Sequence, residues 1–195
     1  MTNYSEHIAG IINSSLSVKQ ALLNDKNLIN VIENVAFKII NCYKSGGKVL
    51  ICGNGGSAAD AQHIAAELSG RFYYDRPSLQ AEALHVNGSY LTAVANDYSF
   101  DEVYARYLSG CGKSGDILIA ISTSGNSENI IRAINTAKKL EMFTVSLTGV
   151  TGGKMKDISD LLINVPSTDT PRIQETHILI GHIICEIVER EMFPR

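Results

Sequence analysis

Apolar residues recur at helical spacing through the first 45 residues of the chain. The positions are Ile12, Leu16, Leu22, Leu28, Val31, Ile32, Val35 and Ile39. Their period fits the 3.6 residues of a helical turn, not the alternation of a strand. Asn24 and Asp25 interrupt the series, which predicts two helices. We expect these helices to cover a face of the following sheet or to pack against another subunit.

From residue 48 the pattern changes to short apolar runs that alternate with helix-like segments. The runs span 48–53, 81–86, 116–121, 143–148 and 161–166. Most are nearly continuously apolar, as strands buried on both faces of a parallel sheet are. Segments such as SENIIRAINTAKKL, and the long stretch 173–190, have helical spacing. This alternation predicts an α/β fold with a doubly wound sheet.

The composition fits a single domain with a substantial core. The chain has 195 residues, a length of about 1.3 typical domains. Hydrophobic residues make up 45% of it, which excludes wholesale disorder. There is no Pro-rich linker, charge block or low-complexity tract. We predict one domain over residues 1–195, in which 1–45 form an N-terminal helical extension.

Charge and cysteine content limit the possible partners and the compartment. The formal net charge is −3, which argues against a basic nucleic-acid binder, because such proteins need a cationic surface for the phosphates. No apolar run approaches the ~20 residues of a membrane helix, and MTNYSEHIAG has no signal-peptide pattern. The cysteines are Cys42, Cys52, Cys111 and Cys185. Two disulfides are formally possible, but we expect free thiols in a reducing cytoplasm, with no nucleic-acid or membrane partner.

The first candidate ligand site follows the apolar run 48–53. The segment Gly53-Asn54-Gly55-Gly56-Ser57, here called the glycine loop, leads into an Ala-rich helical segment. Glycines allow a tight turn and close approach of a ligand, and a helix start offers unpaired N–H groups and the positive end of a dipole. Ser57 can both cap the helix and donate its hydroxyl to an anion.

A second loop of similar design follows the run 116–121. This serine loop is Ser122-Thr123-Ser124-Gly125-Asn126-Ser127, with four hydroxyls in six residues. Either loop alone could be an ordinary helix cap. Two such loops at the carboxyl ends of strands in one sheet indicate a phosphate site, because ligands collect there. Neither is a P-loop or a GxGxxG motif, so a small phosphorylated metabolite suits them better than a nucleotide.

Candidate chemistry lies on the helix after the glycine loop and on the final helix. His63 and Glu67 are four apart and share a face, with Asp60 one turn earlier. A carboxylate beside an imidazole can transfer protons or bind a divalent metal, although a solvent-exposed surface pair is the simpler alternative. His182 stands in an apolar stretch, which fits either a core histidine or a desolvated one in a pocket.

Further polar residues complete the candidate set. Gln174 and His182 are eight apart, roughly 80° around an ideal helix, so they can reach one site only if it lies between them. Glu175 and His177 lie on the same segment. Asn96 and Asp97 form another polar pair at the end of a predicted element. No metal signature here is strong from spacing alone.

The motifs together resemble the bacterial phosphoheptose isomerases, which are sedoheptulose 7-phosphate isomerases of the SIS (sugar isomerase) domain superfamily. The resemblance rests on GNGGSAADAQHIAAEL, AVANDYSFD, ISTSGNSENI, LTGVTGGKM and VPSTDTPRIQETHILIGHIICEIVE, and it covers nearly the whole chain. It implies a five-stranded parallel sheet flanked by helices, and a homotetramer with active sites between subunits. It also implies conversion of sedoheptulose 7-phosphate to D-glycero-D-manno-heptose 7-phosphate, which opens the route to nucleotide-activated heptose for lipopolysaccharide, capsule or another glycan.

The resemblance also implies roles for individual residues. The phosphate-binding serines correspond to Ser57, Ser122, Ser124 and Ser127, with Thr123 alongside. Other substrate contacts correspond to Asn54, Gly55, Gly56, Asn96, Asp97 and Gln174. The catalytic residues correspond to Glu67 and His182, with Asp97 as the active-site aspartate. The Zn²⁺ ligands, in members that bind zinc, correspond to His63, Glu67, Gln174 and His182.

One stretch departs from the family pattern. Similar isomerases often have Thr-Thr-Asp-Thr-Ser where this chain has His85-Val86-Asn87-Gly88-Ser89. The family aspartate is an asparagine here, and the threonine hydroxyls are missing. Because the stretch follows a predicted strand, we expect it to face the sugar and to affect which sugar is accepted.

Aldose–ketose isomerisation moves a proton between C1 and C2 through an enediol or enediolate. We expect Glu67 to be the carbon base and His182 to be the acid/base at the oxygens; a zinc ion would polarise the carbonyl. Two rival hypotheses remain: an isomerase for a different phosphosugar, and a non-catalytic SIS protein that binds a sugar phosphate or a regulatory protein partner. The presence of His63, Glu67, Gln174 and His182 favours the enzyme.

Overall fold

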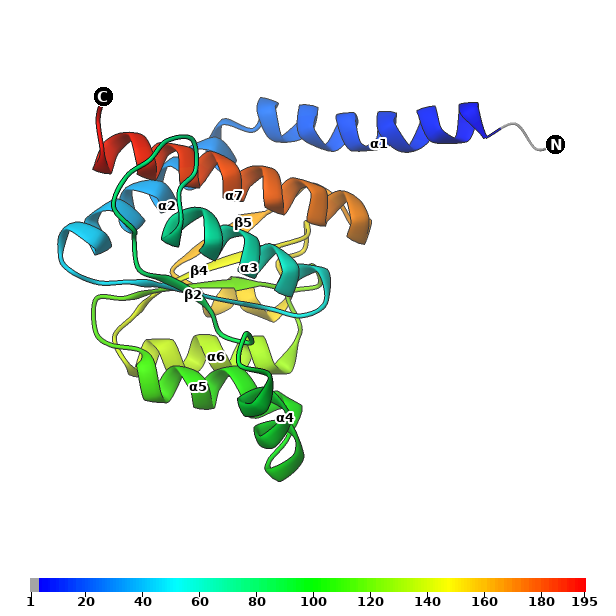
Figure 1. Ribbon diagram of the computed structural model, residues 1–195. Coiled ribbons are helices and arrows are strands. Elements are labelled where there is room, and N and C mark those ends of the chain that lie inside the picture. Colours follow the sequence, from blue (N-terminus) through cyan, green and yellow to red (C-terminus); the bar gives the residue numbers. More distant parts are fainter. Residues whose placement is uncertain (1–3) are drawn as a thin grey trace.

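The computed structural model describes residues 4–195, and a five-stranded parallel sheet forms its centre (Figure 1). The strands are β1 (Val49–Gly53), β2 (Ala81–Ala83), β3 (Ile117–Ile121), β4 (Phe143–Thr148) and β5 (Leu161–Asn164), in the order β2-β1-β3-β4-β5. All four pairings are parallel. The predicted parallel sheet is confirmed, but β2 is shorter than the apolar run 81–86, because the chain turns at Leu84 and His85.

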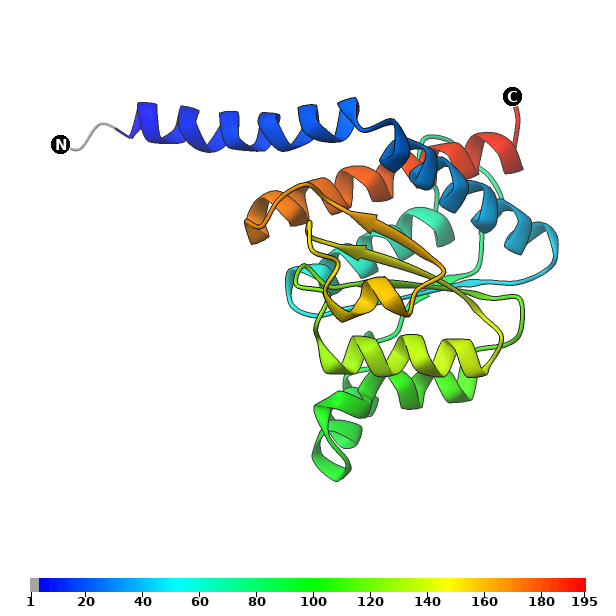
Figure 2. The same ribbon diagram turned by 180° about the vertical axis from the view of Figure 1, so that it is seen from behind.

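Helices cover both faces of the sheet (Figures 1 and 2). One face carries α2 (Lys26–Lys44), α3 (Gly56–Ser69) and α7 (Thr170–Met192); the other carries α4 (Gly88–Asp97), α5 (Val103–Cys111) and α6 (Glu128–Lys139). Two short 3₁₀ helices, η1 (Phe100–Glu102) and η2 (Gly153–Asp157), lie in connections. The doubly wound arrangement predicted from the sequence is therefore confirmed.

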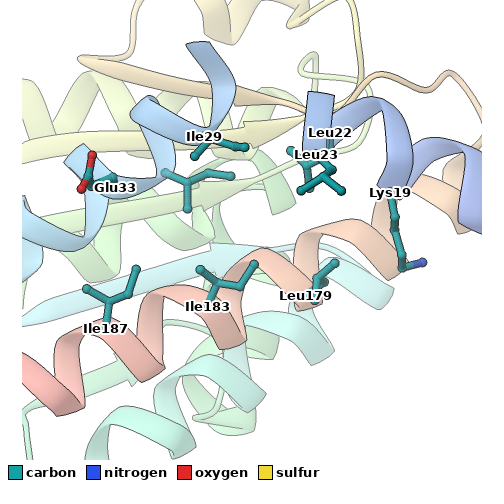
Figure 3. Close-up of a pocket in the computed structure, with 9 residues that line it drawn as sticks. Lys19, Leu22, Leu23, Ile29, Glu33, Leu179, Ile183 and Ile187 are labelled. Carbon is teal, nitrogen blue, oxygen red and sulfur yellow. The ribbon is translucent and has the colours of Figure 1, made fainter. Parts of the chain in front are cut away.

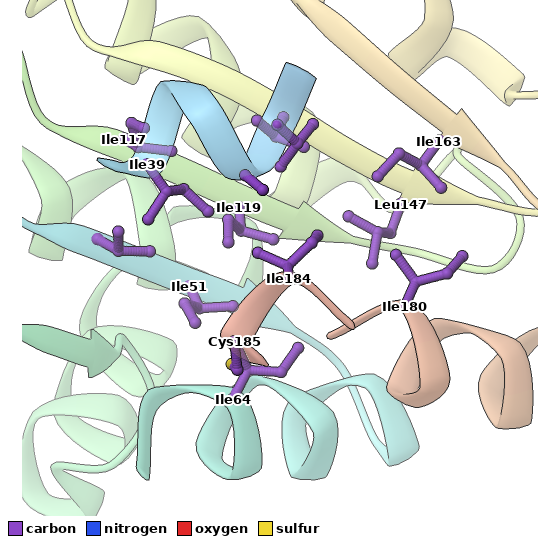
Figure 4. Packing of buried hydrophobic residues seen from close by; sticks show 14 of the residues in the cluster. Ile39, Ile51, Ile64, Ile117, Ile119, Leu147, Ile163, Ile180, Ile184 and Cys185 are labelled. Atoms are coloured by element: carbon purple, nitrogen blue, oxygen red, sulfur yellow. The ribbon is translucent and has the colours of Figure 1, made fainter. Parts of the chain in front are cut away.

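Each strand contributes to two apolar cores, one on either face of the sheet. In β1, Ile51 belongs to the core beneath α2, α3 and α7, whereas its neighbours Leu50 and Cys52 belong to the core above α5 and α6. Figure 4 shows the first core, where Ile180 and Ile184 of α7 pack toward the strands. Because both faces are covered, both alternating positions are apolar, which explains the continuous runs in the sequence.

The N-terminal segment forms two helices, as predicted. Asp25 ends α1 (Ser5–Asn24) and caps α2, where its side chain accepts a hydrogen bond from Leu28 N at 3.0 Å. Most of α1 extends away from the sheet (Figure 2), and only Leu22 of that helix is buried. Within residues 4–195, no helix combines the length and apolarity needed to span a membrane.

Candidate active site

The glycine loop connects β1 to α3 at the carboxyl edge of the sheet. Gly55 has φ +56°, a conformation that glycine adopts without strain, and it occupies the N-cap position of α3. Gly56 is needed because a Cβ there would collide with the side chain of Gln174 from α7. The predicted capping role of Ser57 is wrong: the chain turns earlier, at Gly55, so the nearly buried Ser57 is the second residue of α3. The positive end of the α3 dipole faces this edge.

The serine loop connects β3 to α6, and β3 is the neighbour of β1 in the sheet. Ser122 Oγ lies 3.0 Å from Ser127 Oγ and 3.5 Å from Ser124 Oγ, so three predicted phosphate ligands converge. Gly125 has φ +65° and packs against Gly152, where a Cβ would collide with the backbone. The result is a small cluster of hydroxyl donors held by two tight backbone turns.

A recess of about 300 Å³ that was not predicted from the sequence adjoins the serine loop. Its polar lining is rich in hydroxyls, from Thr123, Ser124, Thr151, Ser167, Thr168 and Thr170. These residues come from the loops after β3, β4 and β5 and from the start of α7. The available signal was the hydroxyl residues at and after the ends of the last two strands, in Thr-Gly-Val-Thr at 148–151 and Ser-Thr-Asp-Thr at 167–170.

Two helices bring together a group that we call the His–Glu cluster, formed by His63, Glu67 and His182. His63 Nε2 lies 3.1 Å from Glu67 Oε1 on α3 and 3.4 Å from His182 Nε2 on α7. The two imidazole rings meet edge to face with centroids 4.9 Å apart. The side chain of His63 is 48% exposed and that of Glu67 is 23% exposed, so the cluster opens to solvent. His182 is therefore not a core histidine, and the i,i+4 pair is not an isolated surface pair.

The cluster fits a divalent metal ion. One ligand atom from each of the three residues lies within 4.8 Å of the others. Two imidazole nitrogens and a carboxylate oxygen this close together are a donor set suited to zinc when the nitrogens carry no proton. Gln174 lies on α7, and its side chain reaches the first turn of α3 beside Gly56.

Asp60 lies on α3 one turn before His63. Its Oδ2 is buried and has no hydrogen-bond partner among the described residues. Burial raises the pKa of Asp60 to about 6, against an opposing effect of His63. A carboxyl group with this environment near an imidazole is common in functional sites.

The predicted pair Asn96 and Asp97 lies apart from the cluster within this chain. Asn96 Nδ2 donates to Asp97 Oδ1 at 2.9 Å, and both residues are exposed at the end of α4. Helix α4 belongs to the face of the sheet opposite α3 and α7 (Figure 1). The structure therefore brings His63, Glu67 and His182 together, but not this pair with them.

The segment that departs from the family pattern begins α4. Asn87 is the N-cap of α4, and its Oδ1 accepts a hydrogen bond from Tyr90 N at 3.0 Å. An aspartate would cap equally well, so helix capping explains a short polar side chain at this position but not the change from Asp to Asn. His85, at the carboxyl end of β2, has a buried Nδ1 without a partner in residues 4–195, and burial lowers the pKa of its imidazole.

Comparison with known proteins identifies the class and then the family. Residues 16–149 match the family model of the SIS domain, so the chain is a SIS-domain protein. It is 51% identical over 195 residues to phosphoheptose isomerase 2 of Campylobacter jejuni, a match that covers 100% of this chain and 97% of that protein. The chain belongs to the phosphoheptose isomerase family.

Two solved structures agree with this membership. The phosphoheptose isomerase of Neisseria gonorrhoeae superposes with a TM-score of 0.90 at 41% identity, over 96% of this chain and 99% of that one. The phosphoheptose isomerase of Francisella tularensis superposes with a TM-score of 0.93 at 38% identity, over 97% of this chain and 100% of that one.

Proposed function

We propose that this chain is an aldose–ketose isomerase that converts sedoheptulose 7-phosphate to D-glycero-D-manno-heptose 7-phosphate. The observation that carries the proposal is the His–Glu cluster, in a chain that matches phosphoheptose isomerases over its whole length. The product would enter nucleotide-activated heptose biosynthesis, for lipopolysaccharide, capsule or another glycan. The four free cysteines support a reducing, cytoplasmic setting.

The phosphate is bound between the two loops. The hydroxyls of Ser122, Ser124 and Ser127 donate hydrogen bonds to its oxygens, and the N-terminus of α3 at Ser57 adds its dipole. From this anchor the sugar extends along α3 toward Glu67, two to three turns further on. Asn54 and Gln174 lie beside this path, at either side of the helix start.

Glu67 and His182 divide the proton transfers. Glu67 takes the carbon-bound proton from one of C1 and C2 and returns it to the other, while His182 moves the proton between the two oxygens. Because Glu67 Oε1 faces His63, its Oε2 is the oxygen available to accept the carbon-bound proton. Between these two transfers the substrate is an enediolate with a C1–C2 double bond.

A zinc ion would be held by His63, Glu67, Gln174 and His182, and when bound it would polarise the substrate carbonyl. The convergence of the His–Glu cluster supports this proposal. Metal analysis of protein prepared without chelators, together with activity after chelation, tests it. Absence of zinc together with full activity would leave the four residues as acid/base and polar groups.

We further propose that the active form is a homotetramer. Ile8, Ile11, Ile12 and Leu16 expose 43% to 56% of their surface on α1. Beside them, a groove of about 560 Å³ runs between α1, α2 and α7, with Leu23, Ile29 and Ile183 in its lining (Figure 3). Exposed apolar area of this kind marks an interface, and a second copy covers it. Light scattering that finds an active monomer at assay concentration would contradict this.

A second copy would also explain Asn96 and Asp97. Their exposed side chains on α4 are free to meet the site of a neighbouring subunit, which would make the active sites shared. Asp97 then takes the role that the family aspartate has. Loss of activity in Asp97→Asn, with the oligomer intact, is the expected result; full activity would remove this residue from the site.

The decisive test of the proposed function is product analysis by NMR. Wild-type protein is expected to convert sedoheptulose 7-phosphate, and to convert arabinose and hexose phosphates poorly or not at all. Conversion of one of those instead would identify an isomerase for a different phosphosugar. Tight binding of a sugar phosphate without any conversion would favour the non-catalytic alternative, a protein that binds sugar phosphate or a regulatory protein partner.

A further inference from the structure

A reciprocal pair of side-chain amides joins the glycine loop to the helix that follows the serine loop. Asn54 Nδ2 donates to Asn129 Oδ1 at 2.9 Å, and Asn129 Nδ2 donates to Asn54 Oδ1, also at 2.9 Å. Asn129 is only 2% exposed and is the second residue of α6. Two parallel hydrogen bonds between planar amides fix both side chains in orientation as well as in distance.

The pair connects the two halves of the proposed phosphate site. On one side, Asn54 O accepts the hydrogen bond of Ser57 N, at the start of α3. On the other side, Asn129 follows Ser127, whose hydroxyl lies 3.0 Å from that of Ser122. A shift of Asn129 would therefore be transmitted to the first turn of α3.

A second contact restrains the same loop from the same direction. The hydroxyl of Tyr104 on α5, a residue 2% exposed, donates to Gly53 O. The glycine loop is thus attached to the α5–α6 layer by a backbone carbonyl and by a side chain, although its own helix, α3, lies on the other face.

We propose that Asn129 is a positioning residue, which holds the glycine loop at the spacing from the serine loop that one phosphate group needs to contact both. The inference rests on the proposed function only in that the ligand carries a phosphate. The pairing also limits the role of Asn54, because Asn129 already uses one amide N–H and one acceptor position of its side chain. Asn54 can therefore offer a substrate only its second amide N–H and the second lone pair of Oδ1.

The test uses Asn129→Leu, which keeps the approximate size and removes both hydrogen bonds. We expect the Kd of inorganic phosphate and the KM of sedoheptulose 7-phosphate to rise about ten- to a hundredfold, with kcat within about threefold of wild type, because Glu67 and His182 are untouched. Thr144→Val is the matched control. It removes a buried hydroxyl that donates to Asp160 Oδ2 at 2.7 Å, at the opposite edge of the sheet, and should leave both constants unchanged.

Asn129→Asp gives an independent readout that a merely structural role would not produce. When protonated, the carboxyl can donate to Asn54 Oδ1 and accept from Nδ2, as the amide does; when ionised, it repels Oδ1. The KM of this variant is expected to be near wild type at low pH and to rise with pH relative to wild type. If Asn129→Leu does not fold, this profile decides the matter, and a pH-independent ratio of the two KM values would overturn the proposal.

The phosphate titration separates this inference from the proposed function, since it needs no turnover. Weaker phosphate binding by Asn129→Leu supports the inference even if wild-type protein does not isomerise sedoheptulose 7-phosphate. An unchanged Kd overturns it even if wild-type protein does. A wild-type protein that binds no phosphate would overturn it as well.

Discussion

Two of the polar contacts that link α3 to α7 are of opposite kinds. The first is the His–Glu cluster, where His63 and Glu67 meet the partly buried His182. The second lies where α7 passes the end of α3: Arg76 Nε donates to Glu189 Oε1 at 3.1 Å, with side chains 2% and 1% exposed. His182 and Glu189 are seven residues apart, so they lie two turns apart on the same face of α7.

Both members of the Arg76–Glu189 pair make further hydrogen bonds. Glu189 also accepts hydrogen bonds from the backbone N–H groups of Phe72 and Tyr73, at 2.9 and 2.8 Å. Burial alone would raise the pKa of Glu189, but these N–H groups and Arg76 hold it below its usual value. Arg76 in turn donates to the carbonyls of Glu67 and Leu68 at the end of α3.

The two contacts differ in whether their carboxylate can still bind a substrate. Glu189 is surrounded by donors and has no capacity left for a substrate, whereas Glu67 is partly exposed and has an oxygen to spare. Phe72 links the two places, because its backbone binds Glu189 while its ring lies 5.7 Å from the ring of His182. The buried contact therefore supports the position of the open one.

The largest expected effect falls on the open contact. Glu67→Gln keeps the size of the side chain but cannot accept the carbon-bound proton, so kcat should fall about 10²–10⁴-fold. The kcat of His182→Ala should fall by a similar factor. The kcat of the double variant should be little lower than that of either single variant, because the two residues act as a unit. Exchange of the substrate C1 proton in deuterated water should vanish in Glu67→Gln; exchange at the wild-type rate would show that the base lies elsewhere.

The next effect falls on the buried contact and should appear in stability. Glu189→Ala leaves the Arg76 guanidinium buried without its partner, which should lower the free energy of unfolding by about 3–5 kcal/mol. The control is Glu186→Ala on the same helix. It breaks the exposed pair with Arg190, at 3.0 Å, and should cost no more than about 1 kcal/mol. Equal losses in urea denaturation would contradict the distinction between the two kinds of contact.

A third prediction concerns another buried group on α7, His177. Its Nε2 lies 3.1 Å from Thr148 O, and burial lowers the pKa of the ring from 6.5 to about 4. The unfolded chain therefore binds a proton more readily, and the wild type loses stability as pH falls from about 6.5 to 4. Measured against His177→Gln, the loss should reach about 3 kcal/mol at pH 4. A difference between the two proteins that does not change with pH would exclude this account.

The smallest effect is expected at the serine loop, which touches neither contact between α3 and α7. If the serine loop binds the phosphate as proposed, Ser122→Ala and Ser124→Ala each remove one hydrogen bond to a charged group, which should weaken substrate binding by about 1.5–3 kcal/mol. Stability should match that of Ser109→Ala, which removes a hydroxyl bonded to Ala105 O on α5. Unchanged affinity in the double variant would remove the serine loop from the phosphate site.

The features that could be predicted from the sequence are those set by residues close together along the chain, such as strands and helix faces. The continuous run through Leu50 and Ile51 was enough to predict a strand with both faces covered, and the spacing of His63 and Glu67 was enough to place both on one face of a helix. The predicted cap at Ser57 failed by two residues, because a glycine with positive φ at position 55 takes the N-cap.

The long-range pairs could not be predicted. Arg76 and Glu189 are 113 residues apart, and Asn54 and Asn129 are 75 apart. Nothing in the residues flanking them marks them as partners, since their pairing is created by the docking of whole elements. The meeting of His63 with His182 has the same origin, and it was expected from the resemblance to the phosphoheptose isomerases, not from the residues that flank either histidine.

The separation of the contacting residues along the chain has a consequence for how the protein is made. His63 and His182 are 119 residues apart, so at about 5–20 residues per second a ribosome needs roughly 6–24 seconds between adding one and the other. During that interval α3 lacks the cover of α7, and Ile64 lacks the contact that it makes with Gly181 in the folded chain. The core beneath α7 and the His–Glu cluster can therefore be completed only after α7 has been synthesised.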